Sequence, residues 1–135
     1  MEKQAVDVLH LSSVGTDIEL LTRCLTRKNF SYKASPHLEA FLKDLDNYKP
    51  RIIVMAGKIQ RSYECESEPL DSFTMGFVPA MPHLENSRLI IYSSEDGALE
   101  MARQRGLEFY DRTDARFASP VGFANELVRI LGERK

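Results

Sequence analysis

Residues 51–57, with the sequence RIIVMAG, decide how the rest of the chain is interpreted. Four consecutive apolar residues, two of them Ile and one Val, lie between Pro50 and Gly57. A short apolar run rich in β-branched residues and bounded by Pro and Gly is typical of a strand that is buried on both faces. Such a strand usually lies at the centre of a parallel sheet. We therefore expect residues 51–57 to form the central strand.

The chain on either side alternates between patterns typical of strands and of helices. We expect further strands at residues 5–11, 29–34, 88–92 and 107–110, and helices at residues 16–28, 36–45, 95–105 and 120–131. Ser35 and Pro36 have the residue types that cap and begin a helix, whereas Asn29 and Gly106 have types that end one. No repeat or linker interrupts the pattern. It predicts one α/β domain over residues 1–135, a doubly wound, five-stranded parallel sheet of order 2-1-3-4-5 in a three-layer αβα arrangement.

The segment 58–87 is the least regular part of the chain. Pro69, Pro79 and Pro82 interrupt it, and we expect a helix only at residues 70–78. The preceding residues 58–68, KIQRSYECESE, predict a loop that is long for a connection in an α/β fold. We therefore expect an insertion or a mobile flap in this segment.

Composition narrows the possible classes of protein. The chain has 135 residues, 43% of them hydrophobic and 28% charged, with a net charge of -2, which is typical of a globular domain and not of a nucleic-acid-binding one. The first residues lack an apolar stretch long enough for a membrane span or a secretory signal, so we expect a cytoplasmic protein that does not bind membranes. Cys24 and Cys65 differ in setting, so we expect two free thiols, with no metal site and no cofactor.

Functional sites in doubly wound folds lie at the carboxyl ends of the strands, beside the point where the strand order reverses. In the predicted topology this edge gathers Ser12, Ser13, Ala56, Ser93 and Thr113 around one shallow crevice. No nucleophile, base and acid can be combined from these residue types. We therefore predict no catalytic residues.

His10 lies within the first predicted strand, on the face opposite Leu9 and Leu11. No serine or cysteine nucleophile can be paired with it from the sequence. We therefore expect a packed histidine with a satisfied ring rather than a catalytic base.

Over essentially its whole length the chain resembles the receiver domain of bacterial two-component response regulators. The features that carry the resemblance are the five βα units, the hydroxyl residues that end the strand in LIIYSS (residues 89–94), the helix-to-strand join ARQRGLEFY (residues 102–110) and the amphipathic last helix. The resemblance implies the same fold and a role in signal transduction.

The resemblance also implies a phosphorylation pocket whose residues are mostly replaced in this chain. Ser12 and Ser13 stand where receivers carry the two acids that hold magnesium, and Ala56 stands where they carry the phosphoacceptor aspartate. Ser93 fits the hydroxyl position, but residues 112–114 contain neither the expected lysine nor the proline. Phosphoryl transfer to a carboxylate requires the carboxylate, and magnesium favours carboxylate oxygens. The resemblance therefore implies a pseudo-receiver.

We accordingly expect a non-enzymatic signalling module that acts through protein–protein interaction, independently of phosphorylation. The expected partner is a sensor kinase, another regulator or a second copy of the chain. The resemblance implies that the face formed by the fourth helix, the fifth strand and the fifth helix binds it, with Glu100, Arg103 and Tyr110 as contacts. The alternative is a flavodoxin-like protein that binds a flavin, a nucleotide or a phosphate at residues 12–16, where small polar residues open a helix.

Overall fold

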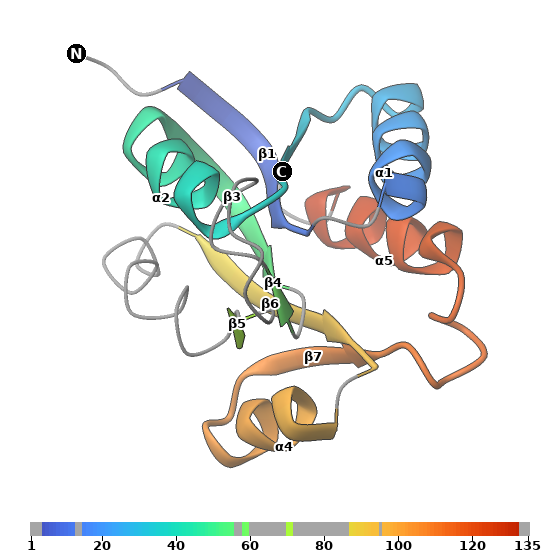
Figure 1. Cartoon of the computed structure of the whole chain (residues 1–135). Coiled ribbons are helices and arrows are strands. Elements are labelled where there is room, and N and C mark those ends of the chain that lie inside the picture. The colour runs from blue at the N-terminus through green and yellow to red at the C-terminus, as the bar shows by residue number, and fades with distance from the viewer. Residues whose placement is uncertain are drawn as a thin grey trace.

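The computed structural model describes residues 4–12, 15–55, 58–59, 70–71, 87–94 and 96–132. A parallel sheet with helices on both faces makes up three layers (Figure 1). Its strands are β2 (Tyr32–Ser35), β1 (Gln4–Leu11), β3 (Tyr48–Met55), β6 (Arg88–Ser93) and β7 (Glu108–Asp111), in that order across the sheet. The order confirms the predicted 2-1-3-4-5 arrangement. The helices are α1 (Gly15–Arg27), α2 (Leu38–Asn47), α4 (Asp96–Gln104) and α5 (Pro120–Gly132).

Strand β3 is the central strand, as predicted. Val54 is paired with His10 of β1 on one side and with Ile90 of β6 on the other. Its four apolar residues, 52–55, are all buried. A run without alternation is therefore explained by burial of both sheet faces.

The predicted boundary of β3 at Pro50 was wrong, because the strand already begins at Tyr48. The Pro50 carbonyl accepts a hydrogen bond from Ser87 Oγ at 2.5 Å, so the Pro50 nitrogen also faces that side of the strand. Strand β6 begins only at Arg88, which is paired with Ile52. No ladder hydrogen bond is therefore lost at the proline nitrogen, and the strand tolerates it.

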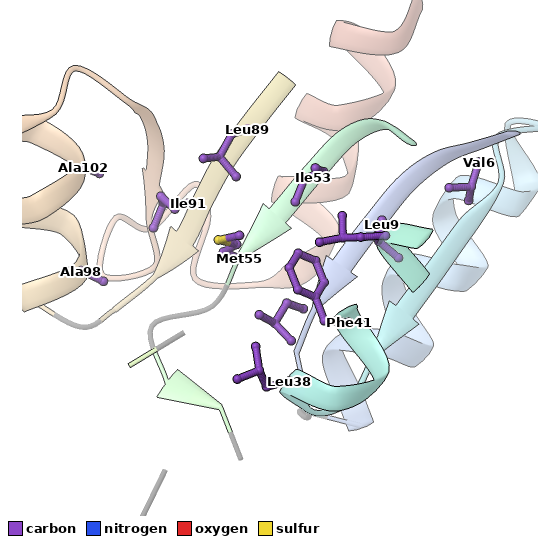
Figure 2. Close-up of a cluster of buried hydrophobic side chains, with 12 residues drawn as sticks. Val6, Leu9, Leu38, Phe41, Ile53, Met55, Leu89, Ile91, Ala98 and Ala102 are labelled. Atoms are coloured by element: carbon purple, nitrogen blue, oxygen red, sulfur yellow. The ribbon is translucent and has the colours of Figure 1, made fainter. Parts of the chain in front are cut away.

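Two clusters of buried side chains fill the space between the sheet and the helices. The cluster on the α2 and α4 face contains Val6, Leu9, Leu38, Phe41, Ile53, Met55, Leu89, Ile91, Ala98 and Ala102 (Figure 2). The cluster on the α1 and α5 face contains Val8, Leu21, Leu25, Ile52, Val54, Ile90, Tyr92, Phe123, Leu127 and Ile130. Figure 1 shows α1 and α5 side by side on that face. In β3 and β6 successive residues alternate between the two clusters, as the period of a strand requires.

The start of the second helix differs from the prediction. His37, and not Ser35, is the N-cap of α2, because its extended backbone lets Nδ1 accept a hydrogen bond from the Ala40 N–H. Ser35 instead ends β2, and its hydroxyl donates to Asp44 at 2.7 Å. Asn29 and Gly106 do end their helices, both with positive φ.

The segment 58–87 also begins differently from the predicted loop and helix. Lys58–Ile59 form β4 and pair antiparallel with Leu70–Asp71, which form β5, so residue 70 does not open a helix. Each two-residue strand satisfies backbone groups of the other. The predicted flap and the remainder of the predicted helix 70–78 lie outside the described residues. Across the described part of the chain, none of the helices has both the length and the apolar character needed to span a bilayer.

Candidate functional site

Three of the predicted pocket residues, Ser12, Ser93 and Thr113, lie at or just beyond the carboxyl ends of strands. Ser12 follows β1 and Ser93 ends β6, and both are buried. The Ser12 N–H donates to the Ser35 carbonyl at 3.0 Å, which joins the ends of β1 and β2. Thr113 is exposed, and its N–H and hydroxyl both donate to Asp111 Oδ1 in a local turn. Ser13 and Ala56 lie outside the described residues.

An ion pair between Asp17 and Arg112 lies at this edge of the sheet. Arg112, just after β7, donates through Nη1 and Nη2 to the two carboxylate oxygens of Asp17, at 2.5 and 3.1 Å. The side chain of Asp17, in the first turn of α1, is only 5% exposed and that of Arg112 is 25% exposed. A bidentate contact of this kind is the strongest form of a carboxylate–guanidinium pair.

The ring of Tyr92, in β6, contacts the Arg112 guanidinium. The Arg112 Cζ lies 4.7 Å from the centre of the Tyr92 ring, and the Arg112 N–H donates to the Ser93 carbonyl at 3.0 Å. The Tyr92 ring stacks on Phe123 of α5, with 3.9 Å between ring centres. Burial raises the pKa of Tyr92. Its hydroxyl therefore stays protonated at neutral pH.

His10 and Tyr32 form a second polar pair on the same face of the sheet. His10 Nδ1 and the Tyr32 hydroxyl share a hydrogen bond of 2.7 Å, and the two rings meet edge to face. Burial, and to a smaller extent the positive charge of Arg112, lowers the pKa of His10 to about 3. Burial and the nearby Asp17 raise the pKa of Tyr32. Both rings are therefore neutral at neutral pH, which agrees with the predicted packed histidine.

The three residues predicted for partner binding lie on either side of the edge strand β7. Glu100 and Arg103 are exposed on α4 and form an ion pair of 2.7 Å, and the Arg103 guanidinium lies over the ring of Phe109. Tyr110 points to the opposite face, where it packs against residues of the α5 side and its hydroxyl donates to Glu108 at 3.2 Å. Neighbouring strand residues alternate in direction, so β7 separates Tyr110 from the α4 pair.

The sequence interpretation missed the roles of Asp17 and Arg112. Asp17 was only part of the predicted helix 16–28, and Arg112 was only part of the stretch 112–114 that contains neither the expected lysine nor the proline. An acid opening the first helix and a base directly after the fifth strand of a 2-1-3-4-5 sheet lie at the same edge. That juxtaposition of opposite charges was the available signal. Within the described ranges, no group of three or more His, Cys, Asp or Glu residues is arranged to hold a metal ion.

Comparison with protein families and with curated proteins finds no match to the sequence. Solved structures do match. The chain is similar to the receiver domain of NtrX from Brucella abortus, with a TM-score of 0.67 and 15% identity over 94% of this chain and 96% of that one. It is also similar to a CheY-like receiver domain from Methanospirillum hungatei, with a TM-score of 0.68 and 7% identity over 98% and 96% of the two chains.

A third similar structure is the non-phosphorylated receiver domain of RcsB from Escherichia coli, with a TM-score of 0.65 and 9% identity over 99% of this chain and 97% of that one. A de novo designed Rossmann 2x3 protein matches as well, with a TM-score of 0.59 and 15% identity over 94% and 86% of the two chains. The arrangement of elements thus does not by itself specify an activity. The chain has the doubly wound fold of response regulator receiver domains.

Proposed function

We propose that this protein is a cytoplasmic pseudo-receiver, a non-enzymatic module of two-component signal transduction that acts through protein–protein contact without phosphorylation. Its partner is a sensor kinase, another regulator or a second copy of the chain. The fold supports the signalling role, since three of the similar structures are receiver domains.

The bidentate pair between Asp17 and Arg112 is the observation that carries the proposal. Magnesium and a phosphoryl group need free carboxylates at the ends of the strands. Ser12 and Ser13 follow β1 in the sequence, and Asp17 is the first acid after them. The Asp17 carboxylate is buried and already occupied by the Arg112 guanidinium. The residue after β3 is Ala56, which has no nucleophilic atom.

The lack of a phosphorylation response is directly testable with beryllofluoride, an acyl-phosphate mimic, added with magnesium. We expect no saturable change in tyrosine fluorescence or in the amide resonances of Ser12, Ser93 and Tyr110. A receiver domain that retains its acid pair and acceptor aspartate serves as the positive control under the same conditions. A saturable, magnesium-dependent shift at these amides would contradict the proposal.

Partner binding at Glu100 and Arg103 is testable with a charge swap that keeps their ion pair. The double variant Glu100→Arg/Arg103→Glu reverses the charges that α4 presents, while the opposite charges remain three residues apart. We expect at least about a tenfold loss of affinity, because like charges brought together across an interface oppose binding. Affinity is measured by titration of the purified partner, and by sedimentation if the partner is a second copy.

The matched control for this swap is Glu19→Arg/Arg23→Glu on α1. Glu19 and Arg23 form an exposed pair of 2.8 Å, comparable to the pair on α4 but on another helix. We expect unchanged affinity for this variant. Equal losses in both variants, or in neither, would show that Glu100 and Arg103 do not contact the partner.

No described feature favours the flavodoxin-like alternative. Anions bind at helix N-termini because the backbone N–H groups and the helix dipole attract negative charge. The first turn of α1 already carries the Asp17 carboxylate. Arg112, the cation beside this helix start, already donates through both Nη atoms to that carboxylate.

A further inference from the structure

We propose that the ion pair between Asp17 and Arg112 fixes the conformation of the β7–α5 connection, residues 112–119, and through it the position of the Tyr110 ring. The inference concerns contacts within one chain and does not require a partner. Only the role of Tyr110 as a partner contact at the β7 edge rests on the proposed function.

The Arg112–Asp17 ion pair links the β7–α5 connection to helix α1. Arg112 is the first residue of the connection, and its two nitrogens hold both carboxylate oxygens of Asp17. The Tyr92 ring covers the guanidinium, and the Arg112 N–H is bonded to the end of β6. The start of the connection is therefore held by charge, by ring contact and by backbone.

The second step leads from Tyr92 to Phe117, further along the connection. The Tyr92 hydroxyl donates to the Phe117 carbonyl at 2.6 Å. The same tyrosine thus contacts Arg112 with its ring and Phe117 with its hydroxyl. A shift of the Arg112 guanidinium changes the surroundings of the ring that holds Phe117.

The third step leads from Phe117 to Tyr110. The two rings meet edge to face, with 4.9 Å between their centres, and Tyr110 also contacts Phe123 at 5.6 Å. Aromatic pairs in this geometry attract each other beyond simple burial. Tyr110 therefore has its position set by Phe117 on one side and by α5 on the other.

The connection also lies directly against the first turn of α5. A Cβ on Gly122 would lie 1.9 Å from the Arg116 carbonyl oxygen, so only glycine permits this approach. The N–H groups of Asp114, Phe117 and Ala118 donate within or just before the connection, to the carbonyls of residues 111 and 114. These bonds are short-range and depend on the ends of the connection being held in place.

Hydrogen exchange of these three amides tests the inference in the full-length chain. Asp17→Asn removes the charged pair at constant size, and Arg112→Gln removes it together with the guanidinium that contacts the Tyr92 ring. We expect the amides of Asp114, Phe117 and Ala118 to exchange about tenfold faster relative to amides of β3, because a local opening becomes easier than global unfolding. We also expect the ring resonances of Tyr110 to shift in both variants.

The matched control is Arg51→Gln at the other end of the sheet. Arg51 pairs with Asp7 at 3.3 Å, and its second nitrogen donates to the Leu131 carbonyl of α5. We expect this variant to leave Tyr110 and the three amides unchanged relative to β3. The same change in Arg51→Gln as in Arg112→Gln, or no change in either Arg112→Gln or Asp17→Asn, would overturn the inference.

A second variant keeps the test decisive if Arg112→Gln does not fold, as judged by circular dichroism. Arg112→Lys retains the charge but has one nitrogen and no planar group to cover the Tyr92 ring. We expect exchange in the connection between that of the wild type and that of Asp17→Asn. If the amide exchange rates and the Tyr110 ring resonances of Arg112→Lys were the same as those of the wild type, the proposed role of the bidentate contact would be overturned.

Discussion

Replacing Arg112 with Met should lower the free energy of unfolding by about 3 kcal/mol, because removing one partner of a buried ion pair leaves the other charge without compensation. The remaining partner is Asp17, whose side chain is only 5% exposed and cannot easily recover water. Methionine keeps much of the length and the contact with the Tyr92 ring, so the loss reports mainly on charge. Urea denaturation at neutral pH measures it.

The reverse replacement and the double variant separate this charge effect from packing. Asp17→Leu leaves Arg112, which is 25% exposed and can turn its guanidinium to solvent. We therefore expect a smaller loss, about 1 kcal/mol, for Asp17→Leu, and recovery of most of the stability of Arg112→Met in Asp17→Leu/Arg112→Met. If the two single variants lost equal free energies of unfolding, and the double variant lost their sum, Asp17 and Arg112 would not be a coupled pair.

Acid should destabilise the protein through His10, by roughly 2–3 kcal/mol between pH 7.5 and pH 4.5. Burial and the Arg112 charge lower the folded-state pKa of His10 to about 3, whereas the unfolded chain has an ordinary histidine. Between pH 6.5 and about pH 3, His10 is therefore protonated in the unfolded state but not in the folded state. The contribution of His10 to stability is fully present above pH 6.5 and is lost progressively as the pH falls toward 3.

The variant His10→Gln isolates this histidine from the other titrating groups. Glutamine removes the titration and retains a polar group for the Tyr32 hydroxyl, while His37 and His83 remain in both proteins. His10 shares a hydrogen bond with Tyr32 on β2 and lies within the electrostatic influence of Arg112 after β7, while Asp17 on α1 acts on Tyr32. We expect a shallower fall in urea-derived stability with pH for His10→Gln. Parallel curves for the two proteins would show that His10 titrates normally when folded.

The fold could be predicted because its main determinants are local and periodic. The apolar run of β3 marks the buried centre of the sheet, and the stripe of α5 from Phe123 to Leu131 marks a helix covering one face. Among the described residues, the errors lie at element ends and in the short strands β4 and β5, which replace a predicted loop and helix start. His37 and not Ser35 caps α2, because Ser35 is paired with Leu11 of β1, which is distant in sequence. Pro50 lies within β3, because the direction of the backbone turns its nitrogen to the side of Ser87, where no ladder hydrogen bond is lost.

The residue types at the strand ends are a property of the sequence alone. Ser12, Ser13 and Ala56 carry no carboxylate in any conformation, which is why a pocket without a phosphoacceptor could be predicted from residue identity. The tertiary structure decided which charges meet. Asp17 and Arg112 are 95 positions apart, and they pair because parallel strands bring their carboxyl ends to one edge and packing against Tyr92 aims the guanidinium. The orientation of the Arg112 guanidinium depends on its packing against Tyr92 in three dimensions, which no local pattern encodes.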